Sequence, residues 1–212
     1  MTRPSVGWMF FACLLACGST LWAEDLERMN ADTAQKFGEK LSQLAVKLEN
    51  PAVRIAPDAA TARGVHRERE AALLLVPKKD LREGDDGDAK LVDSDPGAGL
   101  AYLFTYQVVP VIDGKSVADS KLYDITVNSD EGEQSVRCML LAVRRLADDD
   151  WHLYVYGQDK KPLIDVPFHE GEGPGDKPLA IECKNVEDLE GDVVVTVFGK
   201  YQAGFKVRYA PR

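Results

Sequence analysis

The stretch DVVVTVFGKYQAGFKVRY, residues 192–209, decides the fold class. Apolar and polar side chains alternate over 203–209. A period of two places one set of side chains on the buried face of a strand and the other set in solvent. The apolar set is Ala203, Phe205, Val207 and Tyr209, and the polar set is Gly204, Lys206 and Arg208. The stretch therefore predicts two strands, 192–198 and 203–209.

Short apolar runs separated by turn residues fill the chain from Leu100 onwards. Pairs such as Asp113-Gly114 and Gly191-Asp192 are typical of tight turns. The further candidate strands are 100–111, 121–128, 135–146, 151–157, 163–168 and 179–184, and the apolar run 71–76 is short enough to be a buried strand. Short strands joined by hairpin-length turns predict a mainly β protein. We expect an antiparallel β-sandwich of jelly-roll or immunoglobulin-like type over 71–212.

An amphipathic helix is predicted ahead of the sandwich, over residues 25–49. Its apolar side chains recur at close to the helical period. Asn50-Pro51 ends it, because a residue that precedes proline is displaced from helical backbone angles. One apolar stripe needs a partner surface, and we expect that surface to be the β domain. We therefore assign 24–70 to a helical extension and linker, and 78–99 to a polar loop.

The first residues have the pattern of a secretory signal peptide. Arg3 is followed by an uncharged run, 6–23, which ends in the small residue Ala23 before a charged stretch. We expect cleavage after Ala23, which removes 1–23 as the signal peptide. The mature chain then begins at Glu24 and is secreted or periplasmic.

Two alternatives to this cleavage stay open. In one, the uncharged run serves as a membrane anchor. In the other, Leu14-Leu15-Ala16-Cys17 resembles a bacterial lipobox, in which Cys17 becomes the lipidated first residue of an envelope component. In each case the protein meets a membrane only through this N-terminal segment.

The charge of the chain argues against one class of partner. The formal net charge is −9, and Arg144-Arg145 is the one adjacent basic pair within a strand-like run. Phosphate contacts require clustered lysine and arginine side chains. We therefore expect no nucleic-acid partner.

Two cysteines follow the signal peptide, Cys138 and Cys183. An even pair in an oxidising compartment predicts a disulfide between them; the alternative is two separate buried thiols. Together with Trp151 the pair is similar to the Cys…Trp…Cys pattern of immunoglobulin-like domains, in which a tryptophan packs on an inter-sheet bridge. The similarity ends there, because Cys183 comes too soon to leave room for all the intervening strands. Ile181 also stands where that family has a tyrosine.

Two stretches contain part of a known ligand-binding motif. Gly114-Lys115-Ser116 lacks the glycine that a phosphate loop requires five residues before its Gly-Lys-Ser, where Val109 stands. We therefore interpret Asp113-Gly114 as a hairpin turn. The acidic stretches 85–88 and 93–95 carry oxygen ligands that calcium prefers, but neither has the spacing of an EF-hand.

A third stretch, His169-Glu170-Gly171-Glu172 with Asp176, offers a histidine and carboxylates to a metal or to acid–base chemistry. It lacks the second histidine of a zinc-binding helix, and its glycine and proline neighbours predict a loop. We expect no metal, no cofactor and no catalytic residue from these motifs.

The strand WHLYVY, residues 151–156, offers the best candidate binding face. Trp151, Leu153 and Val155 share one face of the strand, which the aliphatic pair marks as the core. His152, Tyr154 and Tyr156 share the other, where tyrosine suits stacking on a flat ligand or a protein partner. The alternatives are that these rings pack across strands within the sheet, or that the helix 25–49 covers them.

Together these features predict an exported, non-catalytic β-sandwich module. It would bind a ligand, for example a glycan, or a protein partner at the cell envelope or outside it, through His152, Tyr154 and Tyr156. One alternative is a polysaccharide-active enzyme on a jelly roll, with His169 or Glu170 beside a second carboxylate. The other is an envelope component anchored through a lipid on Cys17.

Overall fold

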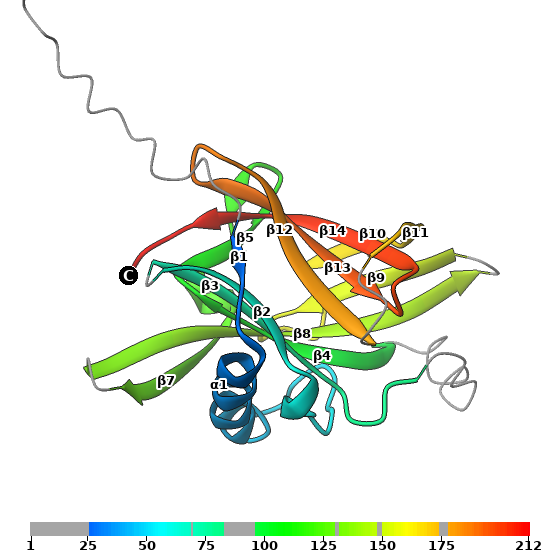
Figure 1. Ribbon diagram of the computed structural model, residues 1–212. Helices are drawn as coiled ribbons and strands as arrows, with labels where there is room; N and C mark the ends of the chain where they lie inside the picture. Colours follow the sequence, from blue (N-terminus) through cyan, green and yellow to red (C-terminus); the bar gives the residue numbers. More distant parts are fainter. Residues whose placement is uncertain (1–25, 69, 83–95, 130–131, 148–149, 174–177) are drawn as a thin grey trace, which may run out of the picture.

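The computed structural model describes residues 26–68, 70–82, 96–129, 132–147, 150–173 and 178–212 (Figure 1). Two antiparallel sheets pack face to face, and helix α1 (Ala31–Ala45) lies on the outer side of the larger one. The predicted antiparallel β-sandwich is confirmed. The predicted signal peptide, the two acidic stretches and Asp176 lie outside the described residues. Among the described helices, none is long and apolar enough to cross a membrane.

The larger sheet contains eight strands in the order β1-β2-β3-β4-β8-β9-β10, with β7 paired to β8. Their bounds are β1 Glu27–Arg28, β2 Arg63–Arg67, β3 Ala71–Pro77, β4 Ala98–Tyr106, β7 Tyr123–Ser129, β8 Gly132–Ala147, β9 Asp150–Tyr156 and β10 Ile164–Pro167. Strands β1 and β2 come from 24–70, so the segment that we assigned to an extension and linker supplies two strands of the sheet.

The smaller sheet contains six strands in the order β12-β13-β14-β5-β6, with β11 paired to β14. Their bounds are β5 Val108–Ile112, β6 Lys115–Ser116, β11 His169–Glu170, β12 Leu179–Glu187, β13 Glu190–Val197 and β14 Tyr201–Tyr209. Strands β13 and β14 are the two predicted from the opening stretch, and they pair without a register shift from Glu190 to Val197.

The chain passes between the sheets at Gln107, which separates β4 from β5. The predicted single strand 100–111 is therefore wrong at this point. Gln107 has a positive φ of 55°, a conformation that a continuous strand does not contain. The Ala210 amide donates to the Gln107 carbonyl at 2.8 Å, and the Tyr209 hydroxyl donates to Gln107 Oε1 at 2.8 Å. These bonds hold the bend against the C-terminal end of β14.

Helix α1 begins later and ends earlier than predicted. Asn30 is its N-cap, with a side-chain oxygen that accepts a hydrogen bond from the Asp32 amide at 2.9 Å, and the residues before it form β1 instead of a first helical turn. Ala34 and Leu41 face the larger sheet and pack in one cluster with its side chains. The expected docking of the helix on the β domain is confirmed.

Two apolar clusters lie on opposite faces of the larger sheet. One fills the space between the sheets, and the other lies between the larger sheet, α1 and the segment after it. Cys138 belongs to the outer cluster and Cys183 to the inner one, and they are two separate buried thiols. The predicted disulfide is wrong because the sheet stands between the two sulfur atoms. Burial raises the pKa of the Cys138 thiol well above its usual range.

The two edges at which the sheets approach each other differ. On one side β12 lies along β2 and β3, and the Arg28 guanidinium of β1 pairs with Glu182 of β12 at 2.8 Å. On the other side β10 approaches β14, and the chain crosses from β10 to β11 between the sheets. We refer to these as the sealed seam and the open seam.

Candidate functional site

The predicted binding face on β9 is not at the surface. Tyr154 is 5% exposed and Tyr156 is fully buried, within the outer apolar cluster. The two rings pack edge to face with centroids 6.1 Å apart, and the Tyr156 hydroxyl donates to the Pro96 carbonyl at 2.9 Å. The prediction of an exposed tyrosine face is wrong, because the chain covers both faces of the larger sheet.

The other face of β9 was predicted correctly at its centre. Leu153 and Val155 are fully buried between the sheets. Trp151 lies at the start of the strand and stays 36% exposed, with the Arg145 guanidinium 5.7 Å from its ring centroid. The tryptophan therefore lies at the rim of the core.

His152 links the β8–β9 hairpin to the edge strand β10. Its Nδ1 lies 2.5 Å from an Asp165 carboxylate oxygen, and its Nε2 lies 3.1 Å from one of Asp150. Both ring nitrogens are therefore engaged by carboxylates of the same sheet. The contacts position β10, and they leave the imidazole no nitrogen for a ligand in this arrangement.

The other sequence motifs lie in a turn and in a short strand within the described part of the chain. Asp113 and Gly114 have φ values of 50° and 73°, the mirror-image turn of a two-residue hairpin, as predicted. His169 and Glu170 are exposed and form β11, paired with Gln202 and Tyr201 of β14. The described residues contain no group of three metal-ligating side chains.

A cluster of charged side chains fixes the C-terminal end of the chain. Arg137 is almost fully buried, and its Nε donates to Asp119 at 2.7 Å, while a terminal nitrogen donates to the Ala210 carbonyl at 3.2 Å. Arg212 donates to Asp119 and Asp124 at 3.1 and 2.8 Å. The Arg137 hydrogen bond is the main cause that lowers the pKa of Asp119. Opposite charges pair within this cluster, which indicates a structural role.

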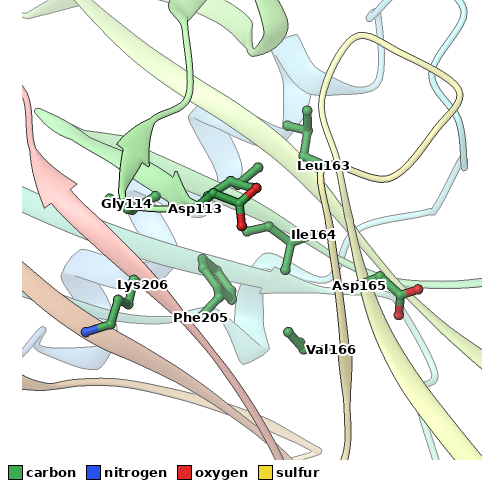
Figure 2. A pocket seen from close by; sticks show the side chains of 10 residues that line it. Asp113, Gly114, Leu163, Ile164, Asp165, Val166, Phe205 and Lys206 are labelled. Carbon is green, nitrogen blue, oxygen red and sulfur yellow. The ribbon is translucent and has the colours of Figure 1, made fainter.

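A cleft at the open seam is the best candidate site of the described structure (Figure 2). Its volume is about 380 Å³. The β5–β6 hairpin forms one wall, β10 with the residue before it forms the other, and β14 lies beneath. The lining residues are Val111, Ile112, Asp113, Gly114, Leu163, Ile164, Asp165, Val166, Phe205 and Lys206.

The cleft exists because β14 lacks a neighbour along part of one edge. Its pairing with β11 ends at Gln202 and its pairing with β5 begins at Val207. Within the described chain, no strand is paired with Ala203–Lys206 on this edge. The β11 chain turns away into β10, while β5 turns away into its hairpin, so the two diverge and leave an apolar hollow over Phe205.

The lining of the cleft is mostly aliphatic. Three charged side chains lie at its rim, and they do not all point in the same direction. Figure 2 shows Asp165 and Lys206 pointing away from the hollow. Asp165 contacts His152, and the Lys206 ammonium lies 3.5 Å from Asp192. The Asp113 carboxylate instead lies between the hairpin and Ile164. The sequence around Asp113 indicates only a turn, so the cleft was not predicted.

Comparison with known protein families, with curated sequences and with solved structures finds no match for this chain. The geometry of the cleft is therefore the basis for a functional proposal.

Proposed function

We propose that the protein is an exported, non-catalytic binding module, and that the open-seam cleft receives an apolar group of its ligand or partner. The hollow of about 380 Å³ at the gap in the β14 ladder carries the proposal. Ligand sites are typically concave, mostly apolar and provided with few polar groups, and sites for small molecules begin at about 300 Å³. The volume of the cleft lies at the lower end of this range, and its lining is mostly apolar.

The chemistry of the lining favours binding over catalysis. Among its described residues, no serine, cysteine or threonine nucleophile lies beside a base, as acyl-transfer catalysis requires. Glycosidases use two carboxylates that flank the substrate. Asp113 faces the hollow, whereas Asp165 points away and is engaged by His152. These features support a module that holds a ligand without transforming it.

Export is part of the proposal and has its own test. N-terminal sequencing of the native protein is expected to find Glu24 as the first residue. An acylated Cys17 at the N-terminus would instead establish the lipid-anchored alternative, with the same cleft exposed at a membrane surface.

An NMR screen of apolar fragments against the mature protein tests the site. We expect amide shift changes to cluster on 111–114, 163–166 and 205–206. Val166→Trp fills the hollow from its β10 wall, and we expect it to abolish these changes. Val127→Trp, at another partly buried valine on the outer side of the larger sheet, is the control and should bind as the parent does. Fragments that bind elsewhere, or equally well to folded Val166→Trp, would overturn the proposal.

A further inference from the structure

On the basis of the proposed binding function, we infer that the open-seam cleft selects an alkyl chain that ends in a positively charged group, with Asp113 as the partner of that charge. A lysine side chain of a partner protein and a free alkylamine both have this chemistry. The cleft supplies an open apolar hollow for the chain and one carboxylate at its rim for the head.

Within the part of the chain that the structure describes, the Asp113 carboxylate has no cationic partner. Within the described chain, no lysine, arginine or histidine nitrogen lies within 4.0 Å of it, although Lys115 follows it in the same hairpin. The other acidic and basic groups at the rim are already paired, Asp165 with His152 and Lys206 with Asp192. Among the three charged residues that line the cleft, Asp113 is therefore the one whose charge is not paired within the described chain.

The hairpin backbone that carries this carboxylate is tied to β14. Asp113 and Gly114 form the tight turn itself, and the Gly114 carbonyl accepts a hydrogen bond from the Arg208 guanidinium of β14 at 3.1 Å. Arg208 also pairs with Glu190, so its own charge is balanced. A turn tied to the strand beneath it loses little backbone freedom when a ligand binds.

The rest of the lining fits the aliphatic part of such a ligand. Ile164 and Phe205 lie beneath the Asp113 carboxylate, and Val166 extends the apolar surface along β10. Lysine side chains bury their carbon stems along apolar surfaces and keep the charged end near water. An ammonium at the rim can contact Asp113 while its chain lies in the hollow.

The net charge of the whole chain also favours a positively charged ligand. A formal net charge of −9 attracts cations over a distance comparable with the Debye length and repels anions. Ionic strength therefore separates this effect from burial of the alkyl chain, because salt weakens the first much more than the second.

The test compares three probes with the same alkyl chain: hexylammonium, hexanol and hexanoate. Titrations of the mature protein are followed by NMR at the cleft amides, at low and at high salt. We expect hexylammonium to bind about two- to fivefold more tightly than hexanol at low salt, as for a partly exposed ion pair, and hexanoate to bind most weakly. The preference should shrink at high salt.

Asp113→Asn is the decisive variant. Asparagine is favoured in this turn, so the hairpin is retained. The affinity for hexylammonium is expected to fall to that for hexanol, while hexanol binding stays unchanged. Asp188→Asn is the matched control: Asp188 is also an exposed turn aspartate with a positive φ, of 46°, but it lies in the β12–β13 turn outside the cleft lining. It should leave the preference intact.

The outcomes separate this inference from the proposed function. Equal binding of the three probes in the cleft, or tighter binding of hexanoate, would overturn the charge selection and leave the binding site in place. Absence of any shift at the cleft amides would overturn both the inference and the proposed function.

A capped peptide with one central lysine, compared with hexylammonium, identifies the source of the alkylammonium group. Tighter binding of either one supports the inference, and the tighter of the two indicates a partner protein or a free amine.

Discussion

The sealed and the open seams join the same two sheets by different means. At the sealed seam β12 lies along β2 and β3, and Glu182 pairs with Arg28 of β1 and with Lys184, both at 2.8 Å. At the open seam β10 and the β5–β6 hairpin diverge from β14, and the cleft occupies the space. A short N-terminal strand covers the first seam. Within the described chain the second seam keeps an unfilled edge, and we propose that the sandwich binds its ligand or partner there.

The same substitution at the two seams should therefore have unequal effects on stability. Leu179 of β12 is fully buried near the sealed seam, whereas Leu163 is a partly buried wall of the cleft. We expect Leu179→Ala to lower the free energy of unfolding by about 2–5 kcal/mol, because it leaves a cavity in the core. Leu163→Ala should cost about 1 kcal/mol or less, since its surroundings already contain open space. Chemical denaturation measures both.

Equal losses for the two leucine variants would show that the open seam is packed as tightly as the sealed one. A larger loss for Leu163→Ala would contradict the comparison outright. The slope of the denaturation curve serves as the control, because a change in slope reports an altered unfolded or native state and not a simple loss of packing.

A second prediction concerns the contact that holds the open seam in shape. His152→Ala removes both imidazole contacts to Asp150 and Asp165 and should weaken the attachment of β10 by about 1 kcal/mol. Hydrogen exchange of the β10 amides should become about fivefold faster, while the most protected core amides change less. His169→Ala, at an exposed histidine of β11, is the control. Uniform acceleration across the core would assign His152 to global stability instead.

The strand pattern could be predicted from the sequence, but the change of sheet within it could not. Residues 100–111 read as one apolar run because β4 and β5 are both buried, and a single residue of positive φ, Gln107, separates them. No feature of the side chains around Gln107 requires that bend. The gap beside β14 follows from this bend and from the β10–β11 crossing. These two features lie far apart in the sequence, so no local sequence pattern predicts them together.

The errors on β9 and on the cysteines have a common cause. Side-chain alternation separates the two faces of a strand, but it does not say whether a further layer covers the outer one. Tyr154 and Cys138 both lie on the outer face of the larger sheet, beneath a layer that includes α1. The nearly continuous apolar character of WHLYVY is the signal that could have indicated burial on both faces.

The smallest expected effect lies at the sealed seam, in the pH dependence of Glu182. Hydrogen bonds from Lys184 and then from Arg28 are the main causes that lower the pKa of this carboxyl. A carboxyl whose pKa is lower in the folded than in the unfolded state stabilises the fold above its unfolded pKa, about 4.3 for glutamate. That contribution is lost as the pH falls through the lower folded pKa.

We therefore expect wild type to exceed Glu182→Gln in unfolding free energy by at most about 1 kcal/mol near pH 6, because both cationic partners are at the surface. The difference should disappear on acidification to about pH 3 and should shrink in high salt. Glu187→Gln, at an exposed glutamate of the same strand, is the control for the substitution itself. Thermal unfolding across this pH range measures the stability of all three proteins.

A difference between wild type and Glu182→Gln that grows towards low pH would reverse the sign required by the ion pairs. It would show that packing of β12 against β2 and β3, and not charge, seals this seam.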